Sequence, residues 1–187
     1  MAQTAAAVIL KRGFDVLVAS LLILLALPLL LVISLLLLVA DRGPVMFRQE
    51  RLGLNEKSFM LFKFRTLEPD APEDIVTPEG DVLVTPLGRL LRRYRLDELP
   101  QLFNVLTGDM AMVGPRPEIA LDLEKLDPAM RSRFLAITPG ITGPVQLEFI
   151  AEDELLAVSA DPTRVYREQL IPAKAAANLK AFQTRSI

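Results

Sequence analysis

Two adjacent carboxylates, Asp97 and Glu98, lie in a stretch that is otherwise rich in arginine, RRYRLDELPQLFNVLTGDMAMVGPRPE. A carboxylate can act as a nucleophile, and the planar fork of arginine binds phosphate oxygens in pairs. A diphosphate repels an attacking carboxylate unless arginines and an oxygen-ligated cation neutralise the charge. The stretch therefore predicts phosphoryl transfer through a carboxyl phosphate, with phosphates bound by Arg92, Arg95 and the proline-flanked Arg116.

A simpler interpretation of the same residues is structural. Asp97 is placed to be the N-cap of a helix, since Pro100 then falls at the third helical position and Gly108 ends the helix. Glu98 would add a favourable charge in the first turn. On residue types alone, capping and catalysis both remain open for Asp97.

The residue types that are missing narrow the chemistry. The chain has no Cys and no His, so a thiolate nucleophile, an imidazole base and a Cys/His zinc site are excluded. A metal would have to be a hard cation with oxygen ligands, such as Mg²⁺. No Walker or Rossmann glycine motif is present, and a net charge of −2 gives no reason to expect a nucleic-acid partner.

The N-terminal part predicts a membrane segment. From Val16 to Ala40 the sequence has 25 consecutive uncharged residues, which as a straight helix would be about 38 Å long. Pro28 lies near the midpoint and is expected to bend the helix. Basic residues flank both ends, Lys11 and Arg12 before and Arg42, Arg48 and Arg51 after, so the charge asymmetry that sets a crossing is nearly absent. A re-entrant helix fits both features, and a kinked transmembrane anchor is the alternative.

The remaining sequence predicts short strands and helices. GPVMFRQERLG and KSFMLFKFRTL each predict a strand, and residues 68–80 predict an acidic, proline-rich surface loop. LGRLLRRYR predicts a basic amphipathic helix at the membrane interface, with Leu87, Leu90 and Leu91 on one side. MRSRFLAITPGITGPVQ predicts a helix followed by a Gly/Pro-rich loop, and the tail from Asp161 predicts helix with a break at Pro172.

Five motifs, in order from Lys11 to Gln146, resemble those of the bacterial sugar transferase family, the small monotopic phosphoglycosyl transferases. They are KRGFDVLVAS, GPVMFRQERLG, FKFRTL, LDELPQLFNVLTGDMAMVGPRPE and PGITG. The resemblance implies transfer of a sugar phosphate from a UDP-sugar to a polyprenyl phosphate with release of UMP, by a ping-pong reaction through a phosphosugar–aspartate intermediate. It implies that Asp97 is the nucleophile and a Mg²⁺ ligand, and that Glu98 helps with metal placement or proton transfer.

The same resemblance implies a substrate-binding set and a membrane helix that is re-entrant and broken at Pro28. The substrate-binding positions are Lys63, Arg65, Arg92, Pro115, Arg116, Pro117 and Gln146. Three positions depart from the family pattern. Leu27 stands where Ser often precedes the helix-breaking proline, Arg95 where Ser or Thr is usual, and Pro144-Val145 where Trp-Ala commonly precedes Gln146.

The expected protein is thus of the α/β class. It is a compact, mostly helical, membrane-associated domain with short strands (residues 42–187) behind an N-terminal re-entrant helix (residues 1–41), on the cytoplasmic face of the bacterial inner membrane. Its expected partners are a UDP-sugar, a polyprenyl phosphate, Mg²⁺ and membrane lipids; a homo-oligomer is left open. The alternatives are another nucleotide donor or acceptor phosphate on the same scaffold, and a catalytically idle membrane adaptor.

Overall fold

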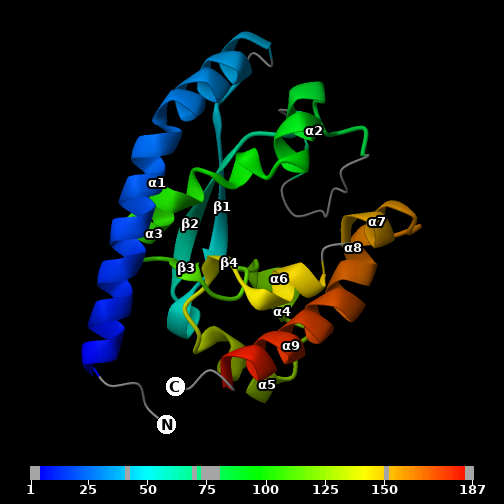
Figure 1. Cartoon of the computed structure of the whole chain (residues 1–187). Helices are drawn as coiled ribbons and strands as arrows, with labels where there is room; N and C mark the ends of the chain where they lie inside the picture. The colour runs from blue at the N-terminus through cyan, green and yellow to red at the C-terminus, as the bar shows by residue number, and fades with distance from the viewer. Residues whose placement is uncertain (1–4, 41–42, 69–70, 73–80, 150–151, 184–187) are drawn as a thin grey trace.

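A long N-terminal helix runs along one side of the molecule, and the rest of the chain packs against it (Figure 1). The computed structural model describes residues 5–40, 43–68, 71–72, 81–149 and 152–183. The elements are α1 (Ala5–Ala40), β1 (Met46–Leu52), η1 (Leu54–Glu56), β2 (Ser58–Phe64), α2 (Pro86–Arg93), η2 (Leu96–Glu98), α3 (Gln101–Thr107), β3 (Ala111–Val113), α4 (Ala120–Leu123), α5 (Pro128–Leu135), β4 (Gly140–Thr142), α6 (Pro144–Glu148), α7 (Glu152–Ala157), α8 (Pro162–Val165), η3 (Tyr166–Leu170) and α9 (Ile171–Gln183). The predicted mixture of helices and short strands, mostly helical, is confirmed.

Helix α1 continues through Pro28 as one helix of 36 residues. Proline removes one backbone hydrogen bond, and the Ser34 hydroxyl donates to the Leu30 carbonyl at 2.7 Å, a contact that also favours bending. Figure 1 shows the axis of α1 turning in its C-terminal part. The helix is therefore bent rather than interrupted, and its path relative to a membrane stays a prediction.

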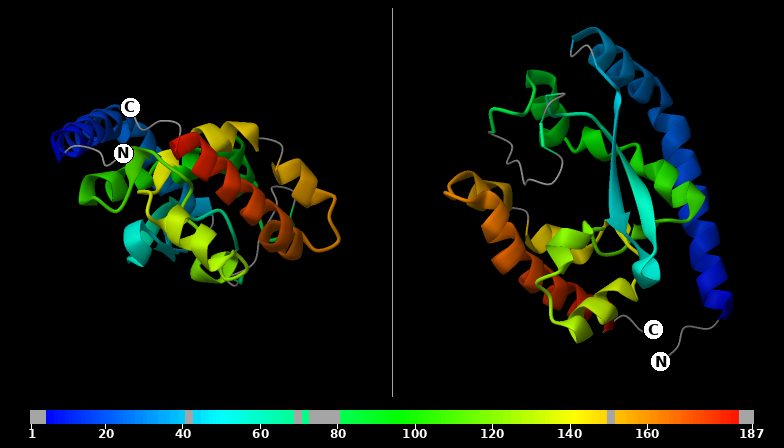
Figure 2. Two further views of the ribbon diagram at one scale, coloured as in Figure 1. Left: turned by 90° about the horizontal axis from the view of Figure 1, so that it is seen from below. Right: turned by 180° about the vertical axis from the view of Figure 1, so that it is seen from behind.

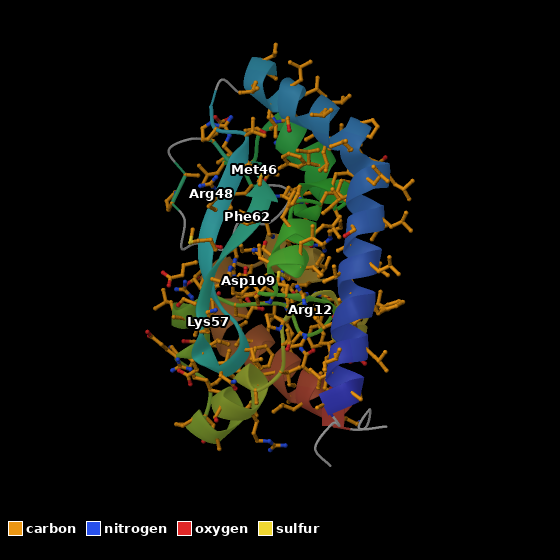
Figure 3. The ribbon with its side chains drawn as sticks, turned by 90° about the vertical axis from the view of Figure 1, so that its left-hand side faces the viewer. Arg12, Met46, Arg48, Lys57, Phe62 and Asp109 are labelled. Carbon is orange, nitrogen blue, oxygen red and sulfur yellow. The ribbon has the colours of Figure 1, made fainter. Side chains whose placement is uncertain are left out.

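Helix α1 lies flat against its own domain. A single stripe of its side chains is buried, Asp15, Ala19, Leu30, Ile33 and Leu37, where α1 meets α3, β3 and the end of the hairpin. Two charged residues fix its first half: Arg12 donates to the Val105 and Leu106 carbonyls at the end of α3, and Asp15 accepts from the Met112 amide. Figure 2 shows α1 along the edge of the molecule in both views, and Figure 3 shows Arg12 directed toward the domain.

The other face of α1 is apolar and unpartnered. Leucines such as Leu17 and Leu24 are 68% exposed, and only 17% of the most apolar stretch of the helix is buried. Figure 3 shows its side chains projecting away from the domain. Helix α1 is long and apolar enough to cross a membrane, and its apolar face is all on one side of the molecule.

The two predicted strands, β1 and β2, are confirmed, and they pair as an antiparallel hairpin with Phe47 opposite Lys63. Alternation along β1 exposes Arg48 and Glu50 and turns the residues between them inward. The Arg48 guanidinium lies 5.8 Å from the centre of the Phe62 ring (Figure 3). Lys63 lies one residue before the end of β2 and is still paired in the hairpin, which fixes its position.

Helix α2 is confirmed, but its apolar side is only partly buried. Leu91 is 2% exposed and Leu87 half-buried, whereas Leu90 is 52% exposed. Thr85 caps the helix by accepting from the Gly88 amide, and Gly88 lies so close to the Thr66 carbonyl that a side chain would not fit. The predicted loop at residues 68–80 lies mostly outside the described residues.

The predicted N-cap role of Asp97 is wrong. Asp97 lies inside the single turn of 3₁₀-helix η2, whose N-cap is Arg95 in the left-handed conformation (φ 55°), without a side-chain cap hydrogen bond. Helix α3 begins only after Pro100 and ends, as predicted, at Gly108 (φ 98°). Because α3 starts about one turn later than expected, the Asp97 carboxylate does not cap it.

The predicted Gly/Pro-rich loop contains a strand that sequence reasoning missed. Strand β4 pairs in parallel with β3, Ala111 with Gly140 and Val113 with Thr142. The segment after β3 stays close to the start of β4, where the Gly140 amide donates to the Pro115 carbonyl at 2.8 Å. A Cβ at Gly114 or Gly140 would clash with the other backbone, so two glycines allow the PRP turn to lie against the PGITG segment.

The C-terminal helices form the opposite side of the molecule. Their core contains Leu123, Phe134, Leu156, Tyr166 and Ile171. The predicted break at Pro172 is not observed. Instead η3 is a π-helical turn directly before α9, and α8, η3 and α9 follow one another without an intervening loop. A π-turn accommodates the missing proline amide, so the helix continues through Pro172.

Candidate active site

A cleft of about 700 Å³ lies between α1, the hairpin and the C-terminal helices. At the α1 side its wall is apolar and includes Leu22, Ala26, Phe64 and Leu102. Its centre and far side are polar and charged. Six of the ten positions predicted from the sequence line this cleft, namely Lys63, Arg92, Asp97, Glu98, Arg116 and Gln146.

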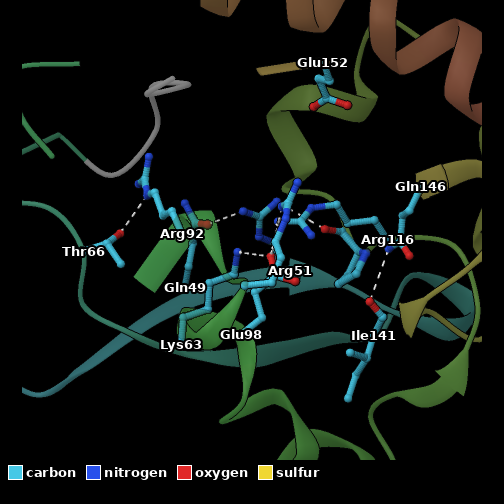
Figure 4. Close-up of polar contacts among 12 residues, drawn as sticks. Gln49, Arg51, Lys63, Thr66, Arg92, Glu98, Arg116, Ile141, Gln146 and Glu152 are labelled. Carbon is cyan, nitrogen blue, oxygen red and sulfur yellow. Dashed lines mark hydrogen bonds and ion pairs between the residues drawn. The ribbon is translucent and has the colours of Figure 1, made fainter. Parts of the chain in front are cut away.

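Glu98 is held by two cations. Its Oε1 accepts from Arg116 Nη2 at 2.8 Å and from Lys63 Nζ at 3.1 Å, while Arg95 Nη1 lies 4.0 Å away (Figure 4). Burial by itself would raise the pKa of Glu98, but Arg116 and Lys63 outweigh it and lower that pKa far below its usual value. Glu98 is therefore ionised at any physiological pH and is not suited to carry a proton.

Asp97 differs from its neighbour. The residue is only 6% exposed, and its Oδ1 is a buried atom with no hydrogen-bond partner among the described residues. Burial raises the pKa of Asp97; Lys63 opposes the rise and Glu98 adds to it. A buried oxygen without a partner costs free energy, and such groups concentrate at functional sites. Asp97 is thus a carboxylate with an unused oxygen inside a cleft lined by cations.

Glu98 favours the charged forms of the two cations that it binds. Glu98 raises the pKa of Arg116 above its usual value. Burial lowers the pKa of Lys63, and Glu98 opposes that effect. Arg92, in the last turn of α2, donates from Nε to Thr66 Oγ1 at 2.9 Å, and this hydrogen bond orients its guanidinium (Figure 4). The site therefore supplies preorganised positive charge beside Asp97.

Three predicted substrate-binding residues, Arg65, Pro115 and Pro117, do not line the cleft, and Arg65 packs farthest from its predicted role. It is 5% exposed, and its guanidinium lies so close to Gly43 that a Cβ there would not fit. The residue follows the last residue of β2, where the alternation that directs Lys63 into the cleft ends. Arg65 therefore packs beneath the start of the hairpin.

The PRP turn and Gln146 shape the side of the cleft near β4. Pro115 and Pro117 are buried and contribute carbonyls: Pro115 accepts from Gly140, and Pro117 accepts from Arg51 Nη1 at 3.3 Å. Gln146 Nε2 donates to the Ile141 carbonyl at 3.4 Å (Figure 4). These contacts fix the backbone that carries Arg116.

Sequence reasoning missed several residues of the cleft. Arg51, interpreted as a charge flanking the membrane, instead lines the cleft together with Gln49, and burial lowers its pKa. The alternation of β1 was the available signal, because it places Phe47, Gln49 and Arg51 on one side.

A second charged cluster at the far side was also missed. We call its members the Lys174 cluster: Glu118, Glu152, Tyr166 and Lys174. Glu118 accepts from the Tyr166 hydroxyl at 3.0 Å, and Lys174 donates to Glu152 at 2.8 Å. Burial, followed by the charge of Glu118, raises the pKa of Tyr166 well above its usual value, so Tyr166 stays a hydrogen-bond donor. No local sequence pattern connects these four residues.

The donor set for a metal is small. Among the residues that the structure describes, no group of three or more Asp or Glu side chains is arranged to hold a metal ion. Glu98 is already occupied by Arg116 and Lys63, which leaves the unpartnered oxygen of Asp97. One carboxylate fits Mg²⁺ only where substrate phosphates and water supply the other ligands, as is common for that ion.

The part of the chain that forms this site matches a known protein family. A family model described as bacterial sugar transferase matches residues 6–168, which include α1, the hairpin and every residue of the cleft named above except Lys174. The chain therefore belongs to the bacterial sugar transferase family, and the resemblance seen in its motifs is confirmed.

Three relatives illustrate the similarity. A UDP-N-acetylgalactosamine-undecaprenyl-phosphate N-acetylgalactosaminephosphotransferase of Aeromonas hydrophila is 38% identical over 161 residues, 83% of this chain and 37% of the relative. A UDP-glucose:undecaprenyl-phosphate glucose-1-phosphate transferase of Escherichia coli (strain K12) is 41% identical over 143 residues, 74% of this chain and 31% of the relative. The exopolysaccharide production protein ExoY of Rhizobium meliloti (strain 1021) is 40% identical over 154 residues, 73% of this chain and 68% of the relative. The chain thus spans about a third of the length of the first two.

Proposed function

We propose that this protein transfers a sugar-1-phosphate from a UDP-sugar to a polyprenyl phosphate and releases UMP. The observation that carries the proposal is the buried Asp97 oxygen without a partner, set in a cleft beside Lys63, Arg92 and Arg116. Relatives whose names specify this reaction, with glucose or N-acetylgalactosamine as the sugar, support it.

The proposed reaction has two displacements at one phosphorus. In the first, an Asp97 oxygen attacks the phosphorus that carries the sugar, and the bond from that phosphorus to the bridging oxygen of UMP breaks, with the electron pair leaving on UMP. In the second, an oxygen of the polyprenyl phosphate attacks the same phosphorus, and the Asp97 carboxylate leaves. Lys63, Arg92 and Arg116 bind the phosphate oxygens and stabilise the charge that develops on them.

Glu98 acts in this proposal as a positioning residue. Its ion pairs hold Lys63 and Arg116 toward the phosphates, and because its pKa lies far below the usual value it neither gives nor takes a proton. This replaces the proton-transfer role considered from the sequence.

The proposal includes Mg²⁺ as a cofactor, held by Asp97 together with oxygens of the diphosphate. When bound, the ion would neutralise phosphate charge and polarise the reacting phosphorus. Removal of Mg²⁺ by a chelator should abolish UMP release, and re-addition should restore it. UMP release that is unaffected by chelation would exclude this part of the proposal.

The membrane arrangement is part of the same proposal. The apolar outer face of α1 would lie in the cytoplasmic leaflet of the bacterial inner membrane, with both ends of the helix on the cytoplasmic side. The packing of α1 along the domain and the apolar wall around Leu22 and Ala26 support a lipid acceptor that enters from this side. Labels at the two termini should be accessible from the same side of sealed vesicles; accessibility from opposite sides would exclude a re-entrant helix.

The reaction is tested by UMP release from the purified protein with Mg²⁺, undecaprenyl phosphate and a panel of UDP-sugars. Release with at least one donor, lost in Asp97→Asn, is the expected result. The matched control is Asp109→Asn, a partly exposed aspartate that does not line the cleft and hydrogen-bonds only Thr107 among the described residues. Full turnover in Asp97→Asn would contradict the proposal, and inactivity of the unmodified protein with every donor would favour the adaptor.

A further inference from the structure

The two ends of the cleft present different chemistry. The end at α1 is apolar, and the centre carries the cations beside Asp97. The far end carries the Lys174 cluster, in which Lys174 is 6% exposed and yet lines the cleft together with Glu152 and Tyr166. In the view of Figure 4, Glu152 lies across the arginine side chains from Glu98. A ligand that reacts at Asp97 and extends away from α1 therefore reaches this cluster.

The chemistry of the cluster suits hydroxyl groups rather than phosphates. Lys174 supplies N–H donors and Glu152, whose side chain is 20% exposed, supplies carboxylate oxygens. A sugar hydroxyl both donates and accepts, so a paired ammonium and carboxylate can bind it from two sides. The carboxylates of Glu118 and Glu152 repel a diphosphate, which places the phosphates at the central cations.

The cluster is poorly suited to a uracil ring. Uracil is a flat aromatic group that stacks on exposed aromatic faces. The one aromatic ring of the cluster, Tyr166, is 7% exposed, and the Lys174 ammonium already lies 4.9 Å from its centre. Lys174 also lies beyond residue 168, where the match to the family model ends. The relatives share a polyprenyl phosphate but are named for different sugars, so a residue outside the matched span suits the part of the substrate that differs.

We propose that Lys174 and Glu152 bind the sugar hydroxyls of the donor and determine which UDP-sugar is used. This inference rests on the proposed function and adds to it the subsite for the transferred sugar. Tyr166 and Glu118 hold Lys174 and the PRP side of the cleft in place, while Lys174 and Glu152 contact the sugar.

The test compares Lys174→Met and Glu152→Gln with the unmodified protein. The kcat/KM is measured for UDP-glucose, UDP-galactose, UDP-N-acetylglucosamine and UDP-N-acetylgalactosamine, together with inhibition by UMP, which has no sugar. A site that hydrogen-bonds a hydroxyl discriminates strongly against an analogue that presents it differently. The ratio of kcat/KM between the preferred donor and its C4 epimer should fall by about tenfold or more in both variants, while inhibition by UMP stays within about twofold.

Two controls separate this result from a loss of fold. Melting temperatures show whether each variant is folded, and Lys125→Met removes a lysine from an exposed ion pair with Glu168, outside the cleft, and should change neither the donor ranking nor UMP inhibition. An unchanged donor ranking in folded variants, or a parallel loss of UMP binding, would overturn the inference. If the unmodified protein releases UMP from no donor, the proposed function fails instead. The same variants are then compared by calorimetric binding of UDP-sugars and UMP, where selective loss of UDP-sugar binding supports the inference and equal loss overturns it.

Discussion

Two acid–base clusters lie at the cleft, and they differ in how their carboxylates are partnered. In the Lys174 cluster each carboxylate has a partner: Glu118 binds the Tyr166 hydroxyl and Arg51, and Glu152 binds Lys174. In the Asp97–Glu98 pair, Glu98 is equally well partnered, but Asp97 keeps a buried oxygen without one. Partnered carboxylates fix the positions of cations, whereas an unpartnered carboxylate has an oxygen available to react. Two carboxylates at the same cleft can therefore have different roles.

The largest expected effect is that of Asp97→Asn on turnover. Loss of the nucleophile should lower kcat by about a thousandfold or more, while the free energy of unfolding should stay equal or rise, because burial already disfavours the charged carboxylate. UMP release and chemical denaturation measure the two effects. If Asp97→Asn lost activity only because it is less stable, Asp97 would be a structural carboxylate like those of the Lys174 cluster.

The next effect is that of Glu98→Gln on stability. Removing one partner from a buried ion pair leaves Lys63 and Arg116 without a counter-charge and should cost about 3 kcal/mol. Because the pKa of Glu98 is lowered in the folded state, its stabilisation is complete above its ordinary value of 4.5 and is lost as the pH falls through the lowered pKa. Denaturation curves of both proteins should therefore differ most at neutral pH and converge in acid. A difference that is the same at every pH would contradict the ionised state of Glu98.

The pH dependence of activity should reflect Asp97 and Lys63. The reactive form of Asp97 is ionised, and its pKa is raised, so kcat/KM should fall in acid through a pKa above the ordinary value of 3.8. Lys63 acts protonated with a lowered pKa, so activity should fall in base below the ordinary 10.5. In Glu98→Gln the basic limb should move to lower pH, because the charge that keeps Lys63 protonated is gone. An unmoved basic limb would assign it to another group.

The smallest effect is expected for Tyr166→Phe. Loss of the hydroxyl removes the hydrogen bond to Glu118 and should destabilise the protein by about 1 kcal/mol. Tyr94→Phe is the matched control, since Tyr94 is 61% exposed, and it should leave the melting temperature unchanged. Equal melting temperatures for the two variants would show that the Glu118–Tyr166 contact is not stabilising.

The sequence predicted the parts of this site that depend on regular local patterns. Alternation along the sequence indicated both strands, and the dense motif from Arg92 to Glu118 indicated the arginines and the two carboxylates, whereas Lys63 was indicated by the family resemblance of its motif. The N-cap position of Asp97 was wrong because a 3₁₀ turn precedes α3, and capping signals do not distinguish the two kinds of helix start.

The remaining parts depend on long-range packing. Strands β3 and β4 have three residues each, too few for a recognisable period, and they pair because Gly114 and Gly140 allow close contact. Lys174 and Tyr166 meet Glu118 only when the C-terminal helices fold back over the cleft. Arg65 shows the converse: the family resemblance implied substrate binding, whereas in the structure the residue follows the end of β2 and lies in the protein interior.

Trapping the covalent intermediate is the most direct test of whether Asp97 is the nucleophile. The purified protein is mixed with Mg²⁺ and the preferred UDP-sugar without a lipid acceptor, quenched with acid, and analysed by intact mass and peptide mass spectrometry. If Asp97 is the nucleophile, we expect a mass increase of one sugar phosphate on Asp97, about one UMP released per active protein molecule, and no adduct in Asp97→Asn. UMP released only when the lipid acceptor is present, with no adduct on Asp97, would contradict it.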